Sequence, residues 1–159
     1  MHDKPMRFWS TAALVCCLAL ATSSCGNGER VATLEEYNTR AITLPDGTLV
    51  RAEAVMKPVD MAKGMMFRDS LPEGKGMLFI HGRADKYPYW MYQTKIPLDI
   101  IWLDKAGRVV ELSEDTPPCE KQASQCPNYG GSVASSVVLE LPGGYSRKHG
   151  VQHGSFISF

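Results

Sequence analysis

Short apolar segments separated by turn sequences constrain the fold of this chain more than any other feature. Residues 41–44 and 48–55 flank Pro45-Asp46-Gly47, in which proline fixes φ and glycine accepts a positive φ, so we expect a β-hairpin. Residues 97–103 and 108–112 flank a second turn, Asp104-Lys105-Ala106-Gly107, and predict a second hairpin. Further short apolar strands are expected at 77–81, 137–141 and 155–159.

Helical periodicity occurs in one stretch only. Pro58 suits a first helical turn, and the apolar residues after it keep helical spacing to about Arg68; a further helical turn is expected before Lys148. Two long segments, 82–96 and 114–136, are expected to be irregular loops. Because there is no βαβ alternation and no internal repeat, the sequence predicts a mainly β fold, a small β-sandwich or partly closed barrel with one or two short helices.

The first 24 residues have the composition of an export signal. Lys4 and Arg7 precede an unbroken apolar run, 12–21, which is too short for a stable membrane-spanning helix but suits a signal-peptide core. Small residues then lead into Cys25, which resembles the lipobox of bacterial lipoproteins, although Thr22 stands where leucine is usual. In a lipobox the cysteine receives the lipid and becomes the first residue of the mature chain.

Cysteine parity favours lipidation over simple secretion. Ordinary signal-peptidase cleavage after residue 23 or 24 is the alternative, and it would leave an unpaired thiol in an oxidising compartment. If Cys25 carries lipid, Cys119 and Cys126 remain and form one disulfide. The predicted organisation is therefore a signal peptide at 1–24, a lipid-anchored flexible tether at 25–39 and a single β-rich domain at 40–159.

Charge and anchoring define the expected partners. The 17 basic and 17 acidic residues cancel and form no basic stripe, so we do not expect nucleic acid as a partner. We expect the protein in the cell envelope, held at the membrane through its N-terminal lipid, and at the outer membrane facing the periplasm if the cell is Gram-negative. A small ligand or an envelope component would be the remaining partner.

Five blocks between Arg40 and Phe159 occur in a consistent order. They are Gly64-Met65-Met66-Phe67-Arg68, Gly76-Met77-Leu78-Phe79, the segment 90–100, Pro118-Cys119 and Val138-Leu139-Glu140-Leu141. In these blocks the chain resembles the domain of unknown function 192 family, with Tyr92-Gln93-Thr94 where that family usually has Lys-Asn-Thr. The resemblance implies a compact, exported or membrane-tethered β domain of sandwich type, and it implies no particular activity.

The segment from Tyr87 to Asp99 has the chemistry of a ligand-binding surface. Tryptophan and tyrosine offer rigid stacking faces for sugar rings or peptide side chains, and Arg68 can hold a carboxylate with two hydrogen bonds. We therefore predict a ligand-binding cluster of Arg68, Trp90, Thr94 and Asp99. The alternative is structural: Trp90 belongs to the core, and Asp99 pairs with Arg68 or caps a turn.

Recognisable catalytic motifs are missing from the sequence. It contains no G-x-S-x-G, no H-E-x-x-H and no phosphate-binding glycine loop, and no cofactor is implied. Binding of a sugar- or peptide-like ligand is therefore the expected function, and whether the protein is also an enzyme stays open. The alternatives are a carboxylate-dependent hydrolase using Asp99 with Glu140 or Glu111, and a structural envelope protein.

No metal site is expected. Cys119 and Cys126 lack the two further ligands that zinc needs, so we interpret them as a disulfide rather than a metal or redox site. The methionines between residues 56 and 66 have the soft sulfur that copper(I) prefers, but their helical spacing favours core packing. His149 and His153 are four residues apart in a glycine-containing segment, which favours surface residues over metal ligands.

Overall fold

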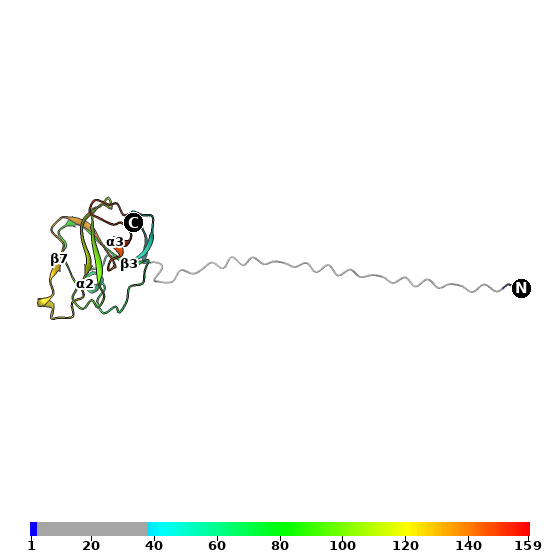
Figure 1. Cartoon of the computed structure of the whole chain (residues 1–159), viewed down its shortest axis with the longest axis horizontal. Helices are drawn as coiled ribbons and strands as arrows, with labels where there is room; N and C mark the ends of the chain where they lie inside the picture. Colours follow the sequence, from blue (N-terminus) through cyan, green and yellow to red (C-terminus); the bar gives the residue numbers. More distant parts are fainter. Residues whose placement is uncertain (3–37) are drawn as a thin grey trace. The chain divides into compact units, whose positions relative to one another are not determined.

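The computed structural model describes residues 1–2 and 38–159 (Figure 1). The predicted signal peptide, its cleavage site, Cys25 and nearly all of the predicted tether lie outside the described residues. The elements are β1 (Thr39–Thr43), β2 (Leu49–Val55), α2 (Pro58–Lys63), β3 (Lys75–Asp85), β4 (Tyr89–Trp90), β5 (Leu98–Leu103), β6 (Val109–Thr116), the 3₁₀ helix η1 (Ala123–Gln125), β7 (Asn128–Tyr129), β8 (Ser135–Pro142) and α3 (Tyr145–Lys148). None of these helices has the length and apolar character needed to cross a bilayer. The mainly β prediction is confirmed.

Within residues 38–159 the strands form a six-stranded sheet in the order β1-β2-β3-β8-β5-β6 and a two-stranded sheet of β4 and β7. Both expected hairpins are present as the antiparallel pairs β1–β2 and β5–β6. β2 and β3 are parallel, because the connection through α2 carries the chain back before β3 begins. The ladders do not close into a barrel.

The C-terminal segment takes the place of the last expected strand. It makes only isolated bridges, from Ser158 to Thr43 of β1 and from Phe156 to Arg108, which immediately precedes β6. These bridges connect both outer strands of the large sheet. The expected strand at 155–159 is thus reduced to two bridges, because each neighbour offers it only a few backbone groups.

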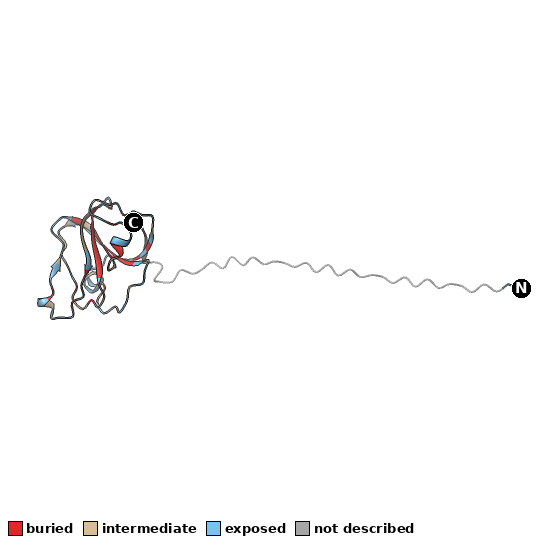
Figure 2. Ribbon diagram, in the orientation of Figure 1, coloured by how far each residue is buried: buried red, intermediate tan, exposed pale blue. Residues whose placement is uncertain are grey.

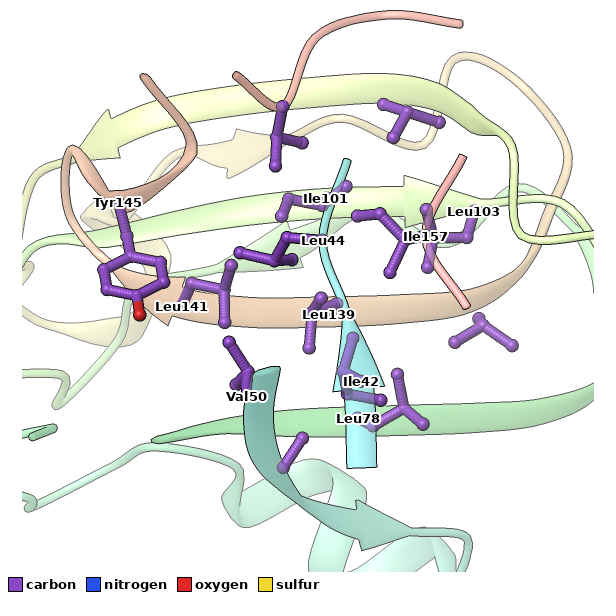
Figure 3. Close-up of a cluster of buried hydrophobic side chains, with 14 residues drawn as sticks. Ile42, Leu44, Val50, Leu78, Ile101, Leu103, Leu139, Leu141, Tyr145 and Ile157 are labelled. Carbon is purple, nitrogen blue, oxygen red and sulfur yellow. The ribbon is translucent and has the colours of Figure 1, made fainter. Parts of the chain in front are cut away.

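One face of the large sheet carries an apolar cluster to which all six strands of that sheet and α3 contribute (Figure 3). Leu139 and Leu141 of β8 point to this face, and Ile157 and Tyr145 pack against them from the C-terminal part of the chain. The central strands β5 and β8 are mostly buried, whereas β7 and the loops near it are largely exposed (Figure 2). Because successive side chains of a strand point to opposite faces, the even-numbered residues of β8 point to the other face of the sheet.

The other face carries a second cluster that long loops cover. Met77 of β3 and Ile100 of β5 lie on this face, and Met65 and Met91 reach it from the loops that follow α2 and β4. The disulfide between Cys119 and Cys126 is present, as predicted, and also belongs to this cluster. Of the methionines interpreted as packing residues, Met65 is buried in this cluster and Met61 packs against it, whereas Met56 is 61 % exposed.

Two local expectations need correction. α2 ends at Lys63 and not near Arg68, because Gly64 adopts a positive φ of 45° that a helix cannot continue. The segments expected to be irregular pair with each other, through Tyr89 with Tyr129 and Trp90 with Asn128. Strands of two residues are too short to show a periodic pattern, so the sequence did not reveal them.

Candidate functional site

A row of side chains crosses the loop-covered face of the large sheet at one level. Glu53 of β2 lies opposite Met77 of β3, Met77 lies opposite Glu140 of β8, and Glu140 lies opposite Ile100 of β5. Residues opposite one another in a sheet point to the same face. The row therefore places two carboxyl groups on one face, separated by a methionine.

Glu140 is a buried acid, and one of its carboxyl oxygens has no hydrogen-bonding partner among the described residues. Its residue is only 4 % exposed, and its Oε2 atom makes no hydrogen bond to any residue that the structure describes. Burial raises the pKa of Glu140 to about 8, because the apolar surroundings disfavour the charged form. Glu140 is therefore a neutral carboxylic acid at pH 7, with a proton to donate.

Arg68 lies close to both carboxyl groups but binds only one. Its guanidinium donates two hydrogen bonds to Glu53, of 2.6 and 2.7 Å, and this pair lowers the pKa of Glu53. The positive charge of Arg68 also lowers the pKa of Glu140, although by less than burial raises it. The two acids thus differ in charge state: Glu53 is an ionised partner of Arg68, and Glu140 stays protonated.

The loops over this face are joined by backbone hydrogen bonds. Phe67 N–H donates to the carbonyl oxygen of Gln93 over 2.8 Å, and Gln93 N–H donates to the carbonyl oxygen of Cys119 over 2.9 Å. Phe67 and Gln93 have positive φ angles of 66° and 55°, which residues other than glycine rarely adopt. The Cys119–Cys126 disulfide holds the third loop of this assembly.

Three aromatic residues lie on these joined loops, and we call them the aromatic surface: Phe67 and Trp90, which are exposed, and Tyr92, which is partly buried against the second cluster. Phe67 is 57 % exposed and Trp90 is 41 % exposed. The rings of Trp90 and Tyr92 are in contact, with centroids 5.2 Å apart. Large exposed aromatic groups on a fixed backbone are typical of binding surfaces.

Tyr89 extends the buried side of the same loops toward the sheet. Its ring packs edge-on against Phe79 and Trp102, and its hydroxyl group lies 3.0 Å from His81 Nε2. Burial raises the pKa of Tyr89, and at the high pH where a tyrosine ionises the then charged Glu140 adds to this effect. Tyr89 therefore stays neutral and fixes the start of the segment that carries Trp90.

The structure brings three of the four predicted ligand residues to this region. Arg68 follows Phe67, Trp90 is part of the aromatic surface, and Thr94 follows Gln93. Thr94 is buried and donates its backbone N–H to the carbonyl oxygen of Met91 over 3.1 Å. Of these three, only Arg68 and Trp90 present side chains at the surface.

Asp99 does not join them. It is fully buried opposite Leu141, on the face away from Glu140. Its carboxylate accepts backbone N–H groups from Asp115, Gly144 and Ser146, at 2.6, 2.9 and 2.6 Å. Asp99 therefore fixes the turn that begins α3, which is the structural alternative considered for it.

The same geometry bears on the alternative of hydrolysis by paired carboxylates. Asp99 and Glu140 point to opposite faces of the sheet, so they cannot flank one scissile bond. Glu111 lies opposite Trp102, also on the loop-covered face, and its carboxylate accepts hydrogen bonds from Ser132. The arrangement does not support a hydrolase that uses Asp99.

Glu53, Phe67 and Tyr92 were not recognised from the sequence as site residues, and Glu140 was considered only as a partner for Asp99. A signal for Glu140 was present, because an acidic residue interrupts an otherwise apolar strand at 137–141. The others had no local signal: the Glu53–Arg68 pair depends on a loop contact, and the exposure of Phe67 depends on its positive φ. These features follow from the tertiary fold.

Two further features of a possible site are metal-binding side chains and surface hollows. The described part of the chain has no cluster of three or more His, Cys, Asp or Glu side chains arranged to hold a metal ion. His149 Nδ1 lies 2.8 Å from Asp46, and His153 is exposed. A shallow hollow of about 600 Å³ lies beside β6, and none of the predicted ligand residues lines it.

Fold and site together define a small, disulfide-containing β domain in which loops cover one sheet face and a buried acid. Residues 41–159 match the family model DUF192 (Uncharacterized ACR, COG1430). Since this match covers most of the chain, the protein belongs to that family.

Solved structures share this fold. A protein of unknown function from Novosphingobium aromaticivorans is 27 % identical, with a TM-score of 0.67 over 76 % of this chain and 85 % of that chain. A putative transcription regulator from Sinorhizobium meliloti is 24 % identical, with a TM-score of 0.64 over 74 % of this chain and 89 % of that chain, and this likeness concerns the fold alone. No curated protein matches this chain significantly.

Proposed function

We propose that this protein is a small binding module of the cell envelope that holds a sugar- or peptide-like ligand on its aromatic surface. The exposure of Phe67 and Trp90 on hydrogen-bonded, disulfide-linked loops carries this proposal. Apolar rings at the surface are costly in water unless something covers them. Stacking on a sugar ring or a peptide side chain would cover these rings.

The loops that carry the aromatic surface have a fixed backbone geometry, and this supports a role in ligand binding. The positive φ angles of Phe67 and Gln93 each cost free energy, and such strain is found where a particular backbone geometry is used. A surface that is already fixed loses little conformational entropy when it binds. Arg68, which is partly exposed beside Phe67, provides a polar edge for a ligand lying on the rings.

The location follows from the N-terminal sequence. We propose that lipid on Cys25 holds the domain at the membrane, on the periplasmic side of the outer membrane in a Gram-negative cell. The ligand would then be a component of the envelope or a small molecule within it. The membrane contact itself would come from the lipid, because the charge of the chain is balanced.

The test is a binding screen with a matched control. Full-length protein in detergent micelles would be titrated with N-acetylated chitotriose, called chitotriose below, and with cellotriose and trialanine, and binding measured by calorimetry. We expect at least one of these probes to bind, and Trp90→Ala to weaken that binding at least tenfold. Phe156→Ala removes another exposed ring, at 55 % against 41 % for Trp90, and should leave binding unchanged. Equal affinities of the wild type and Trp90→Ala, or no binding by any probe, would contradict the proposal.

A further inference from the structure

Ligand binding on the aromatic surface does not account for the buried carboxyl group of Glu140 on the same side of the sheet. Buried polar groups normally have hydrogen-bonding partners, and Glu140 Oε2 has none among the described residues. Its strand neighbours are Met77 and Ile100, whose side chains offer no donor and, in the methionine sulfur, only a weak acceptor. An acid retained in such surroundings indicates a partner that the protein chain does not supply.

Glu140 lies on the sheet face that is covered by the loops carrying the aromatic surface. Met65 precedes Phe67 by two residues, Met91 lies between Trp90 and Tyr92, and both methionines pack in the same cluster as Met77 beside Glu140. Methionine side chains are unbranched and flexible, so this cover can rearrange at low cost. Arg68, at the edge of the same loops, interacts electrostatically with Glu140.

The proton on Glu140 determines which ligand groups it can bind. A neutral carboxylic acid donates one hydrogen bond, whereas a carboxylate can only accept. An uncharged acceptor suits this apolar position, because burying a second charge there would be costly. The amide carbonyl is an uncharged acceptor that sugar-like ligands carry in acetamido groups and peptide-like ligands carry in their backbone.

We propose that Glu140 donates a hydrogen bond to an amide carbonyl oxygen of the ligand held on the aromatic surface. The proposal rests on the proposed binding function and specifies the chemistry of its ligand. In an acetamido sugar the methyl group beside this carbonyl would pack against the methionines. The flexible cover of Met65 and Met91 would give way as the amide enters.

Binding should then depend on pH in a defined way. Burial raises the pKa of Glu140 to about 8, and the charged or titratable groups that act on it are Arg68 and Tyr89, with Glu53 acting through its pair with Arg68. β3 and β5 contribute only Met77 and Ile100 beside it. One pH unit above its pKa, roughly one Glu140 in eleven keeps its proton, so affinity should fall about tenfold between pH 6.5 and pH 9.

The experiment compares amide-containing probes with amide-free probes of similar shape. Chitotriose is compared with cellotriose, and trialanine with its ester analogue, on full-length protein in detergent at pH 6.5 and 9. These two arms distinguish an acetamido sugar from a peptide as the source of the amide. The wild type should prefer the amide-containing member of one pair at least tenfold at pH 6.5 and lose most of this preference at pH 9.

Two variants separate this inference from a fold defect and from the proposed function. Glu140→Gln keeps a donor without titrating, so it should bind equally at both pH values, whereas Glu140→Leu should lose the amide preference while melting no lower than the wild type. Equal affinity for both members of each pair would overturn the inference, as would an unchanged pH dependence in Glu140→Gln. If such a result came with binding that still required Trp90, the binding function would stand and only the role of Glu140 would fail.

Discussion

Phe67 donates its backbone N–H to the carbonyl oxygen of Gln93 over 2.8 Å, and both residues have a positive φ. Among the described residues, Asp115 is the only other non-glycine residue with this property. Each such residue costs on the order of 1–3 kcal/mol, and it persists only where its surroundings enforce it. Two strained residues thus hold each other in place directly beside the aromatic surface.

Replacing Phe67 with glycine should separate stability from binding. Phe67→Gly removes the conformational penalty of a positive φ together with a ring that is 57 % exposed, so we expect the free energy of unfolding to rise by up to about 1 kcal/mol in urea titrations. Ligand binding should weaken, because a stacking face is lost. Phe67→Ala is the control: it loses the ring but keeps the strain, and a stability gain as large as that of glycine would count against strain as the cause.

Truncating the two tryptophans of the β domain should destabilise the protein to very different degrees. Trp102 is fully buried and donates its indole N–H to the carbonyl oxygen of Tyr87 over 2.8 Å, so Trp102→Ala should cost about 3–5 kcal/mol. Trp90 is 41 % exposed, and Trp90→Ala should cost less than half as much. Chemical denaturation measures both, and a comparable loss in the two variants would place Trp90 in the core.

Asp99→Asn should destabilise the protein without altering the ligand site. The carboxylate accepts three backbone N–H groups, and an amide would turn a donor toward at least one of them, so we expect a loss of about 2–3 kcal/mol. Asp104→Asn is a suitable control, because Asp104 accepts two backbone N–H groups in a more exposed turn and should cost less. An Asp99→Asn variant of wild-type stability that had lost ligand binding would return Asp99 to the ligand site.

Stability should fall with rising pH because of Glu140. Its pKa is raised from 4.5 to about 8 on folding, so between these values the folded state binds more protons than the unfolded state and the free energy of unfolding decreases as pH rises. The maximum effect is several kcal/mol, at about 1.4 kcal/mol per pH unit. Urea titrations at pH 5 and pH 8 should show this loss in the wild type and a smaller one in Glu140→Gln. Parallel curves for the two proteins would rule out a raised pKa.

The lipid anchor can be tested independently of the fold. Cys25→Ala removes the sulfur to which the predicted lipobox attaches lipid, so the precursor should stay unprocessed or be degraded. Membrane fractionation with labelled palmitate measures this directly. Normal processing and membrane retention of Cys25→Ala would show that the export signal works in another way.

The hairpins and the disulfide could be predicted because their signals are local. Pro45-Asp46-Gly47 specifies the turn between β1 and β2 by its own backbone preferences, and Cys119 and Cys126 are separated by only six residues. The parallel pairing of β2 with β3 has no such signal, because it depends on how the connection through α2 returns to the sheet. Its consequence, the placing of Glu53 and Glu140 on one face, was therefore not predictable.

Asp99 shows that long-range contacts also limited the prediction of the candidate site. Its chemistry suggested a ligand residue, but its partners Gly144 and Ser146 are 45 and 47 residues away in the chain. Which face of β5 it occupies follows from the pairing with β8, and that pairing is not local. Trp90 and Arg68 were easier to place, since Trp90 lies in a segment without apolar periodicity and Arg68 follows the predicted helix.

The indole N–H signal of Trp90 in nuclear magnetic resonance spectra tests the central claim most directly. In full-length protein in detergent micelles, the Trp90 signal is assigned with a Trp90→Phe variant, and the signal of buried Trp102 serves as an internal reference. During titration with chitotriose or trialanine, binding on the aromatic surface predicts a saturable shift of the Trp90 signal while the Trp102 signal stays in place. A Trp90 signal that does not move with a probe that binds the protein would contradict the account.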